Sequence, residues 1–184
     1  FIENKSNIFI KNLEIASHVA NDIFNDSNFP DLNGDLLINC LESFKMPPGR
    51  GEIFSLNKFK IIDDSYNANP ESVKAALDHL SGFTENRKFF VFGDMKELGA
   101  NEEIFHKKVG QYAVGKADIL FTVGKLAKNA QSNSNNFALS LHFNDNFSLL
   151  EKLTELLTDG DIILIKGSRS MQLDQLIDEL KNVK

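Results

Sequence analysis

Apolar and polar positions follow one another in blocks along most of this chain, and the blocks predict strands followed by helices. Between the strands, apolar residues recur at helical spacing, as at Val73, Ala76, Leu77 and Leu80. Four runs are nearly all apolar, as strands buried on both faces are: residues 60–64, 88–94, 118–124 and 161–167. This alternation implies right-handed crossovers. It predicts an α/β, Rossmann-like fold with a mainly parallel sheet and helices on both faces.

Two weaker stretches are candidates for additional strands. Residues 52–56 (EIFSL) are expected to pair antiparallel with 60–64 through a short turn, and residues 137–143 form another apolar stretch. The sequence QSNSNN at 131–136 is interpreted as a polar loop.

The first 46 residues have a different pattern, which is polar and mostly helical. A stripe of apolar residues predicts one helix, and a second short helix is predicted over 34–44; the stripe consists of Leu13, Ala16, Val19, Ala20 and Ile23. The following MPPGRGE has two prolines and two glycines, which interrupt helices and strands. We therefore predict two domains, residues 1–46 and 47–184. Because the chain begins with Phe in mid-pattern, we expect it to be a fragment of a longer protein.

Composition and charge narrow the class of protein. The 184 residues are 42% hydrophobic with a net charge of −6, and there is no basic run, which argues against a nucleic-acid partner. A single cysteine, Cys40, fits a reducing compartment. No segment has the length of a membrane span, and no signal peptide is visible. We expect a soluble, cytoplasmic, monomeric protein with no membrane partner.

Each of the strong strands ends in polar or glycine residues. The strand ends read DDSYNANP, GDMKELG, VGK and KGSRS. In open parallel sheets, ligands bind outside the carboxyl ends of the strands. The segments around 64, 94 and 168 are therefore expected to share one edge of the sheet and to form a binding site there.

The segment IIDDSYNANPESVKAAL, residues 61–77, carries the strongest local signal. Asn69 followed by Pro70 is typical of a helix N-cap with proline at the first helical position. The cap leaves Asp63 and Asp64 unexplained, because adjacent carboxylates repel and need donors, a cation or water. A ribose hydroxyl or a metal-bound nucleotide would satisfy them.

Three other motifs each allow a plain interpretation and a functional one. In KGSRS, a serine can cap the last helix, or the loop can bind an anion with Arg169 paired to a carboxylate. GRGE is a hinge, or it presents Arg50 at a domain interface. GDMKELG is a simple turn, or it turns Asp94 toward a ligand. The residues alone leave these alternatives open.

Other chemical sites are not indicated. GQYAVGKA, 110–117, nearly matches a phosphate-binding P-loop, but Ala117 replaces the required hydroxyl and the segment leads from a helix into a strand. The dinucleotide fingerprint G-x-G-x-x-G is absent. The four histidines, at 18, 79, 106 and 142, lack metal-ligand spacing, so no metal site is predicted.

Taken together, these motifs resemble those of the ATP-dependent Mur ligases of peptidoglycan synthesis. The resemblance covers residues 47–184 and rests on PPGRGE, DDSYNANPESVKAAL, GDMKELG with His106 after it, and KGSRSM, in that order. It implies a Rossmann-like third domain preceded by the tail of the central ATP-binding domain. The implied cofactors are ATP and Mg²⁺, with Mg²⁺ held mainly by the missing part of the central domain. The implied partners are UDP-N-acetylmuramoyl-tripeptide and D-alanyl-D-alanine, which are joined through an acyl phosphate.

The resemblance also implies roles for particular residues. Arg50 and Asp64 match residues that contact the nucleotide and serve catalysis, Asp64 by holding the ribose. Asn12 is the preferred match for a nucleotide-contacting asparagine of the central domain, with His18 and Asn21 as the rival alignment. The remaining positions are implied to contact the amino substrate: Tyr66, Asn67, Asn69, Asp94, Ser168 and Arg169.

The sequence also departs from the family pattern, because no P-loop precedes these motifs within the chain. We therefore expect the 184-residue chain alone to be inactive. Two alternatives remain open: a folylpolyglutamate synthase-like ligase, and a non-catalytic Rossmann-like module that binds nucleotides.

Overall fold

The structure is a computed structural model that describes residues 7–24, 39, 43, 47–56, 59–84 and 87–182. The chain divides into two compact units, residues 1–46 and 47–184. The described part of the first unit is mainly helix α1, Asn7–Phe24. Apart from Asn39 and Ser43, the second helix predicted over 34–44 lies outside the described residues.

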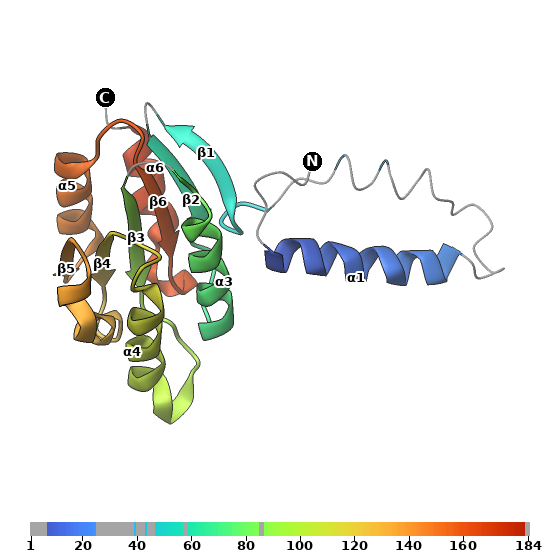
Figure 1. The fold of residues 1–184 in the computed structure, drawn as a ribbon, viewed down its shortest axis with the longest axis horizontal. Coiled ribbons are helices and arrows are strands. Elements are labelled where there is room, and N and C mark those ends of the chain that lie inside the picture. Colours follow the sequence, from blue (N-terminus) through green and yellow to red (C-terminus); the bar gives the residue numbers. More distant parts are fainter. Residues whose placement is uncertain are drawn as a thin grey trace. The chain divides into compact units, whose positions relative to one another are not determined.

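The second unit is built on a six-stranded sheet with the order β1-β2-β6-β3-β4-β5 (Figure 1). β1 pairs antiparallel with β2, and the other neighbours are parallel. These strands confirm the predicted fold class, the antiparallel pairing of 52–56 and the strand within 137–143. Their bounds are Glu52–Leu56 (β1), Phe59–Asp64 (β2), Lys88–Gly93 (β3), Ile119–Val123 (β4), Leu139–Phe143 (β5) and Ile162–Lys166 (β6).

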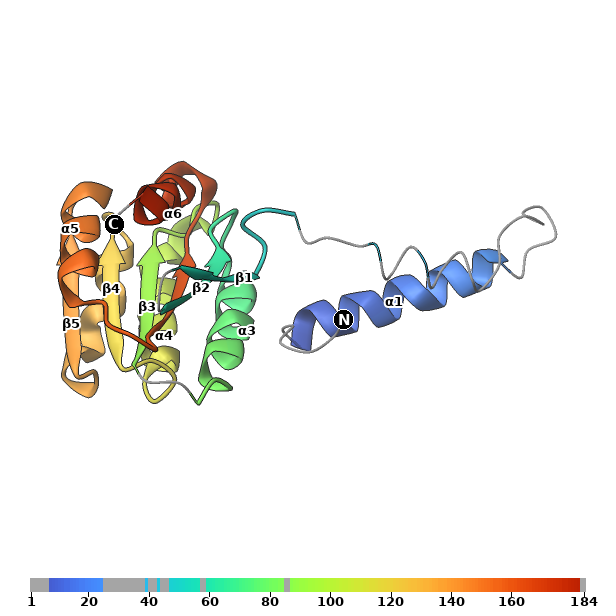
Figure 2. The same cartoon turned by 90° about the horizontal axis from the view of Figure 1, so that it is seen from above.

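Helices cover both faces of this sheet, as predicted. Figure 2 shows α3 and α4 on one side of the strands and α5 and α6 on the other. Successive strand residues point to opposite faces. In β6, Leu164 therefore packs with the α3 and α4 core, and Ile163 and Ile165 pack with the α5 and α6 core. The helices are α3 (Pro70–Ser81), α4 (Glu102–Ala113), α5 (Asn146–Leu156) and α6 (Leu173–Asn182).

One prediction about a connection is wrong. Residues 131–136 are not a simple loop, because they belong to the 3-10 helix η2, Ala127–Asn136. This helix packs against α4 so closely that a Cβ on Gly110 would collide with the backbone of Ala130. Gly110, the first residue of the rejected P-loop match, is thus required for helix packing.

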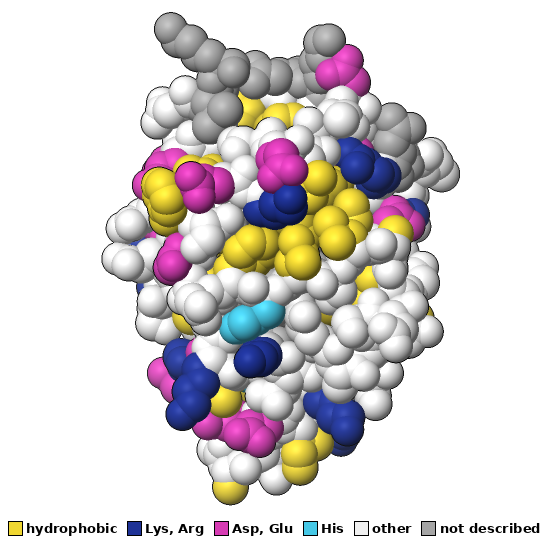
Figure 3. All heavy atoms as spheres, turned by 90° about the vertical axis from the view of Figure 1, so that its left-hand side faces the viewer, with side chains coloured by type: hydrophobic (Ala, Val, Ile, Leu, Met, Phe, Trp, Pro, Cys, Tyr) yellow, Lys and Arg dark blue, Asp and Glu magenta, His cyan; other side chains and the backbone are white. Residues whose placement is uncertain are grey.

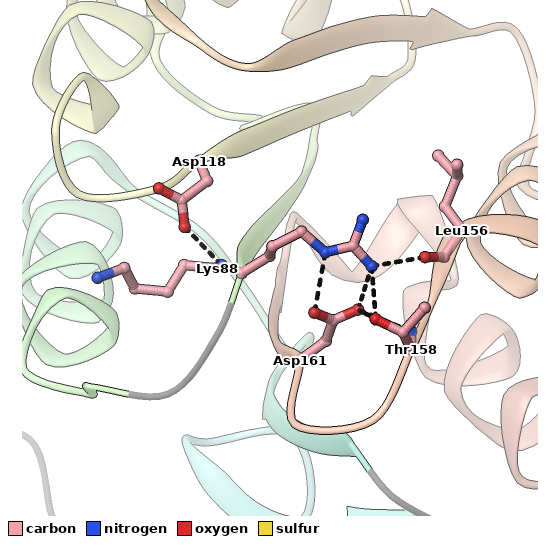
Figure 4. A network of polar contacts seen from close by, with 6 residues as sticks. Lys88, Asp118, Leu156, Thr158 and Asp161 are labelled. Atoms are coloured by element: carbon pink, nitrogen blue, oxygen red, sulfur yellow. Dashed lines mark hydrogen bonds and ion pairs between the residues drawn. The ribbon is translucent and has the colours of Figure 1, made fainter.

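A network of polar contacts closes the amino-terminal edge of the sheet (Figure 4). Arg87 donates to both carboxylate oxygens of the fully buried Asp161, at 3.1 and 2.7 Å, and to the carbonyl of Leu156 at 2.7 Å. Nearby, the Lys88 amide donates to Asp118 at 2.8 Å. The ion pair is consistent with the raised pKa of Arg87, whose main cause is the hydrogen bond to Asp161. Because the polar groups at this edge are paired with one another, we assign them a role in holding the fold together and not in binding a ligand.

The side of the sheet that ends in β5 is rich in hydrophobic side chains. Figure 3 views the molecule from the side of α5 and β5 and shows these side chains gathered across the middle of the face. Leu139, Leu141 and Phe143 of β5 are half-buried, and Phe147 of α5 is 67% exposed. Among the described helices, none has the length and apolar character needed to cross a membrane.

Candidate functional site

The carboxyl ends of β2, β6 and β3 lie side by side, because these three strands are adjacent and parallel. The segments that follow them are joined by direct contacts. The amide of Ser168 donates to the carbonyl of Asp94 at 2.9 Å, and Lys166 pairs with Asp64 at 2.7 Å. This confirms that the segments around 64, 94 and 168 share one edge. We call this edge the rim and define it as residues 64–69, 94–98 and 166–170.

The paired aspartates at the start of the rim have separate partners. Asp63 is buried and accepts hydrogen bonds from the amide and hydroxyl of Ser65, at 3.1 and 2.6 Å. Asp64 directs Oδ2 to the Lys166 ammonium, while Oδ1 accepts no hydrogen bond from the residues that the structure describes. Burial raises the pKa of Asp64, and Lys166 opposes that rise. Asp64 therefore has one carboxylate oxygen available to a ligand.

Arg50 lies over the ring of Tyr66, with its guanidinium carbon 4.2 Å from the ring centroid. Two backbone bonds fix the loop that carries it: Tyr66 donates to Gly49 at 3.0 Å, and Gly51 donates to Asp63 at 2.7 Å. Gly49 has a φ of 74°, and a Cβ there would lie 3.0 Å from the Tyr66 amide, so glycine is required. Within the described part of the chain, the exposed guanidinium has no carboxylate partner. The stacking leaves its N–H groups available for an anion.

Asn67 and Asn69 both use their side chains to shape the turn. Asn67 Oδ1 accepts from the amide of Ala68 at 2.8 Å. Asn69 forms a capping box with Ser72, and Pro70 begins α3. The interpretation of Asn69-Pro70 as a helix start is therefore confirmed. Both side chains are exposed, and their contact with a substrate stays a prediction.

The carboxylate of Asp94 is buried and holds together two segments. Its Oδ1 accepts from the amides of Leu126 and Ala127 at 2.9 and 2.8 Å, at the start of η2. Its Oδ2 pairs with Lys96 at 2.9 Å. These bonds explain why an aspartate stands there, and the predicted contact of Asp94 with a ligand stays a prediction.

Ser168 and Arg169 are also engaged within the fold. The Ser168 hydroxyl is buried and accepts from the amide of Lys96 at 2.8 Å. Ser168 makes no side-chain cap at the 3-10 helix η3, Arg169–Met171. Arg169 pairs with Asp174 at 2.6 Å, and both side chains are partly exposed. A ligand carboxylate at Arg169 would therefore compete with Asp174.

Two residues important for the rim are assigned no role by the sequence analysis. Lys166, almost fully buried, bonds to Asp64 and to the carbonyl of Asn67. His106 is fully buried, accepts from the Met95 amide through Nε2 at 2.8 Å, and contacts the Glu102 carbonyl through Nδ1 at 2.6 Å. A carbonyl only accepts, so Nδ1 carries the proton. Burial lowers the pKa of His106, which favours this neutral form.

Asn12, the remaining predicted residue, is exposed on α1 in the first unit, and its nucleotide contact stays a prediction. No group of three or more His, Cys, Asp or Glu side chains within the described ranges is arranged to hold a metal ion. We therefore assign no Mg²⁺ ligand to these residues.

Comparison with known proteins finds a matching family and similar sequences. Residues 49–169 match the family model described as "Mur ligase, glutamate ligase domain". The UDP-N-acetylmuramoyl-tripeptide–D-alanyl-D-alanine ligase of Rickettsia prowazekii is 31% identical over 168 residues, covering 89% of this chain and 37% of that protein. The enzyme of the same name from Bacillus subtilis is 40% identical over 128 residues, covering 65% of this chain and 27% of that protein.

Solved structures agree with the sequence comparison. The MurF ligase from Thermotoga maritima in complex with ADP superposes with a TM-score of 0.69 at 28% identity, covering 79% of this chain and 33% of that one. MurF from Acinetobacter baumannii gives a TM-score of 0.76 at 26% identity, covering 83% and 35%. A folylpolyglutamate synthase from Thermotoga maritima, at 17% identity and a TM-score of 0.55, shares the fold alone.

The chain thus spans roughly a third of the length of the relatives that it matches. The family model covers well over half of the chain's residues, and the two relatives named above carry the same name. This chain belongs to the Mur ligase family and contains that family's C-terminal domain.

Proposed function

We propose that this chain is the C-terminal part of an ATP-dependent ligase that joins D-alanyl-D-alanine to UDP-N-acetylmuramoyl-tripeptide. The observation that carries the proposal is the pair formed by Asp64 of the rim and Arg50, which is stacked on Tyr66 of the rim. Arg50 is an exposed cation without a described carboxylate partner, and Asp64 keeps one oxygen free. The name shared by the relatives from Rickettsia prowazekii and Bacillus subtilis supports the substrates.

The two groups suit different parts of a nucleotide. A carboxylate oxygen accepts hydrogen bonds from ribose hydroxyls, and a guanidinium binds phosphate oxygens. The backbone bonds from Gly51 to Asp63 and from Tyr66 to Gly49 join the loop that carries Arg50 to the end of β2 that carries Asp64. ADP in the solved Thermotoga maritima relative agrees with a nucleotide as ligand. We therefore assign Asp64 to the ribose and Arg50 to the phosphates of ATP.

The remainder of the rim suits the amino substrate. Tyr66, Asn67 and Asn69 are exposed on the turn beside Asp64. Arg169 is partly exposed and can bind the carboxylate of D-alanyl-D-alanine once it leaves Asp174. The nucleotide and the dipeptide would then lie on two sides of the same turn.

The proposed reaction proceeds in two balanced steps. The tripeptide carboxylate takes the γ-phosphoryl group of ATP, which gives an acyl phosphate and ADP. The amine of D-alanyl-D-alanine then attacks the acyl carbon, so that a C–N bond forms, the C–O bond to phosphate breaks, and the amine loses a proton. Mg²⁺ would neutralise phosphate charge during the first step. Arg50 would contribute positive charge there, and Arg169 would orient the dipeptide.

The proposal concerns a protein longer than this chain. The relatives are about two and a half times as long, and this sequence contains no G-x-x-x-x-G-K-[ST] motif to hold phosphates. The cytoplasmic location also stays a prediction from the sequence. The alternative of a folylpolyglutamate synthase-like ligase is supported only by a shared fold.

Steady-state kinetics of the full-length protein test the proposed roles. We expect Arg50→Ala and Asp64→Asn to raise the KM for ATP by about tenfold or more, because each removes a charge-assisted hydrogen bond worth about 1.5–3 kcal/mol. Lys181→Met, which removes an exposed lysine paired with Asp178, is the matched control and should leave KM unchanged. Equal, small effects of all three substitutions would contradict the assignment of Arg50 and Asp64.

A further inference from the structure

The side chain of Lys166 places an ammonium group in the interior of the second unit. Lys166 is the last residue of β6, in register with Asp64 of β2 and Phe92 of β3. Leu164, two residues earlier, belongs to the core beneath α3 and α4, and strand alternation puts Lys166 on the same face. Only 2% of its side chain is exposed. The cation therefore lies under the turn that leads into α3.

Lys166 bonds to both ends of that turn. Its Nζ lies 2.7 Å from Oδ2 of Asp64 and donates to the carbonyl of Asn67 at 2.9 Å. Asp64 is on the proposed nucleotide side, and Asn67 is on the proposed dipeptide side. One ammonium group thus connects the two halves of the candidate site.

Fold stability alone is a poor reason for a lysine at this position. Removing two charges from water costs several kcal/mol per ion, and well-packed apolar residues of similar volume are often neutral or stabilising replacements. The site is also near the amino-terminal end of α3, where the helix dipole disfavours a cation. The bonds that Lys166 makes therefore point to function at the rim.

We propose that Lys166 is a positioning residue that orients Asp64 and fixes the 64–69 turn, so that ATP binding and D-alanyl-D-alanine binding depend on the same side chain. This inference rests on the proposed function. Lys166 makes no covalent bond and transfers no proton in the proposed reaction. It acts through Asp64, whose Oδ1 it leaves free for the ribose, and through the backbone of Asn67.

The charge of Lys166 also affects the ionisation of Asp64. Burial raises the pKa of Asp64, and the neighbouring Asp63 adds to the rise, whereas Lys166 lowers the pKa through its charge and its hydrogen bond, and the charge of Arg50 lowers it as well. Replacing the lysine with an uncharged residue removes the larger of the two lowering contributions, so the pKa of Asp64 rises further. A protonated Asp64 would bind ribose hydroxyls less well, so the acid limb of the pH profile for ATP should move to higher pH.

The test is Lys166→Met in the full-length ligase, with Lys181→Met as the control for loss of a lysine. We expect the KM values for ATP and for D-alanyl-D-alanine to rise together, each by about tenfold, as loss of a hydrogen bond to a charged group implies. The acid limb of kcat/KM for ATP should shift to higher pH. Unchanged KM values, a rise in only one of them, or an unmoved acid limb would overturn the proposal.

A double variant tests whether Lys166 acts through Asp64. If it does, Lys166→Met added to Asp64→Asn should raise the KM for ATP by much less than Lys166→Met raises it alone. Fully additive effects would contradict this route.

Nuclear magnetic resonance of the 184-residue chain separates failure of this inference from failure of the proposed function. Lys166→Met should shift the amide resonances of residues 64–69 and speed their hydrogen exchange, and Lys181→Met should not. This readout needs no ligase activity, so it holds even if the wild-type full-length protein forms no product. Unchanged amides at 64–69 would overturn the positioning role, as would unfolding of the whole unit, because that would make Lys166 a stability residue.

Discussion

Asp63 and Asp64 are neighbours in the chain, yet their carboxylates bond to different kinds of partner. Asp63 is satisfied by Ser65, two residues away, and this local pattern is typical of aspartate in turns. Asp64 depends on Lys166, which is distant in sequence and reaches it only through the pairing of β2 with β6. Of the two carboxylates, only that of Asp64 is tied to a residue across the sheet.

Sequence reasoning at the residue scale succeeds where the partner is local. The cap formed by Asn69 and Pro70 can be predicted because the bonding partner, Ser72, lies three residues away. The two amides that donate to Asp94 Oδ1 lie more than thirty residues away, at the start of η2, and the partners of Lys166 lie across the sheet. Only the fold brings them together, which is why a ligand-facing role could be suggested for Asp94 but its structural role could not.

Arg169 gives a prediction that depends on its pairing with Asp174. If Arg169 binds the carboxylate of D-alanyl-D-alanine, Asp174 competes with the substrate for the same guanidinium. We expect Asp174→Asn in the full-length protein to lower the KM for the dipeptide by a few-fold, because partly exposed ion pairs contribute about 0.2–1 kcal/mol. Steady-state kinetics with varied dipeptide would measure this.

Arg169→Ala is the companion variant and should raise the same KM while leaving the KM for ATP unchanged. An Asp174→Asn enzyme whose KM for the dipeptide is unchanged or higher would argue against Arg169 as the carboxylate-binding residue.

The elements themselves follow from the sequence more closely than their connections do. The strong strands and the helices that follow them are found at the predicted positions. The strands are buried on both faces and each helix is buried on one, so burial leaves a pattern of apolar residues that can be recognised in the sequence. The sequence predicts a loop over residues 131–136 because this segment is polar, but in the structure these residues belong to the 3-10 helix η2, which packs on α4. Whether such a segment forms a helix depends on its tertiary contacts more than on its local sequence.

The connection between β3 and α4 depends on one histidine. His106, on α4, accepts the Met95 amide and so holds the segment 94–98 that carries Lys96. Phe92 packs beside the ring at a centroid distance of 5.5 Å. Burial lowers the pKa of His106 and is the largest cause. The hydrogen bond to the Glu102 carbonyl and the charges of Asp94 and Glu102 raise the pKa, and the charge of Lys96 lowers it. Protonation of Nε2 would remove the acceptor for Met95.

The lowered pKa of His106 predicts a loss of stability on acidification. Below the unfolded-state pKa of 6.5, the unfolded chain binds a proton that the folded chain does not, so the free energy of unfolding falls as pH falls. Above that pH the contribution is fully present. The expected slope is at most roughly 1.4 kcal/mol per pH unit for one group, from pH 6.5 down to the lower folded-state pKa.

Denaturant unfolding of wild type and His106→Gln between pH 5 and pH 8 would measure this difference. The chain's two tyrosines, Tyr66 and Tyr112, both belong to the second unit, so tyrosine fluorescence follows that unit. Burial also lowers the pKa of His142, which is present in both proteins and cancels in the comparison. An equal slope in both proteins below pH 6.5 would contradict the role given to His106.

On the scale of the whole molecule, the chain combines a complete α/β unit with a shorter amino-terminal unit. The six-stranded sheet, its two cores and the rim all belong to residues 47–184. The assignment of residues 1–46 to the tail of an ATP-binding domain stays a prediction. The chain matches about a third of each relative, so the ligase reaction is proposed for a longer protein that contains these residues.

The most direct test of the proposed function compares the full-length protein with the 184-residue chain. Each would be incubated with ATP, Mg²⁺, UDP-N-acetylmuramoyl-tripeptide and D-alanyl-D-alanine, and ADP and the ligated product would be quantified. We predict that the full-length protein forms both in equal amounts only when all substrates are present, and that the 184-residue chain forms neither. A full-length protein that forms no ligated product, or a 184-residue chain that forms it, would contradict the account.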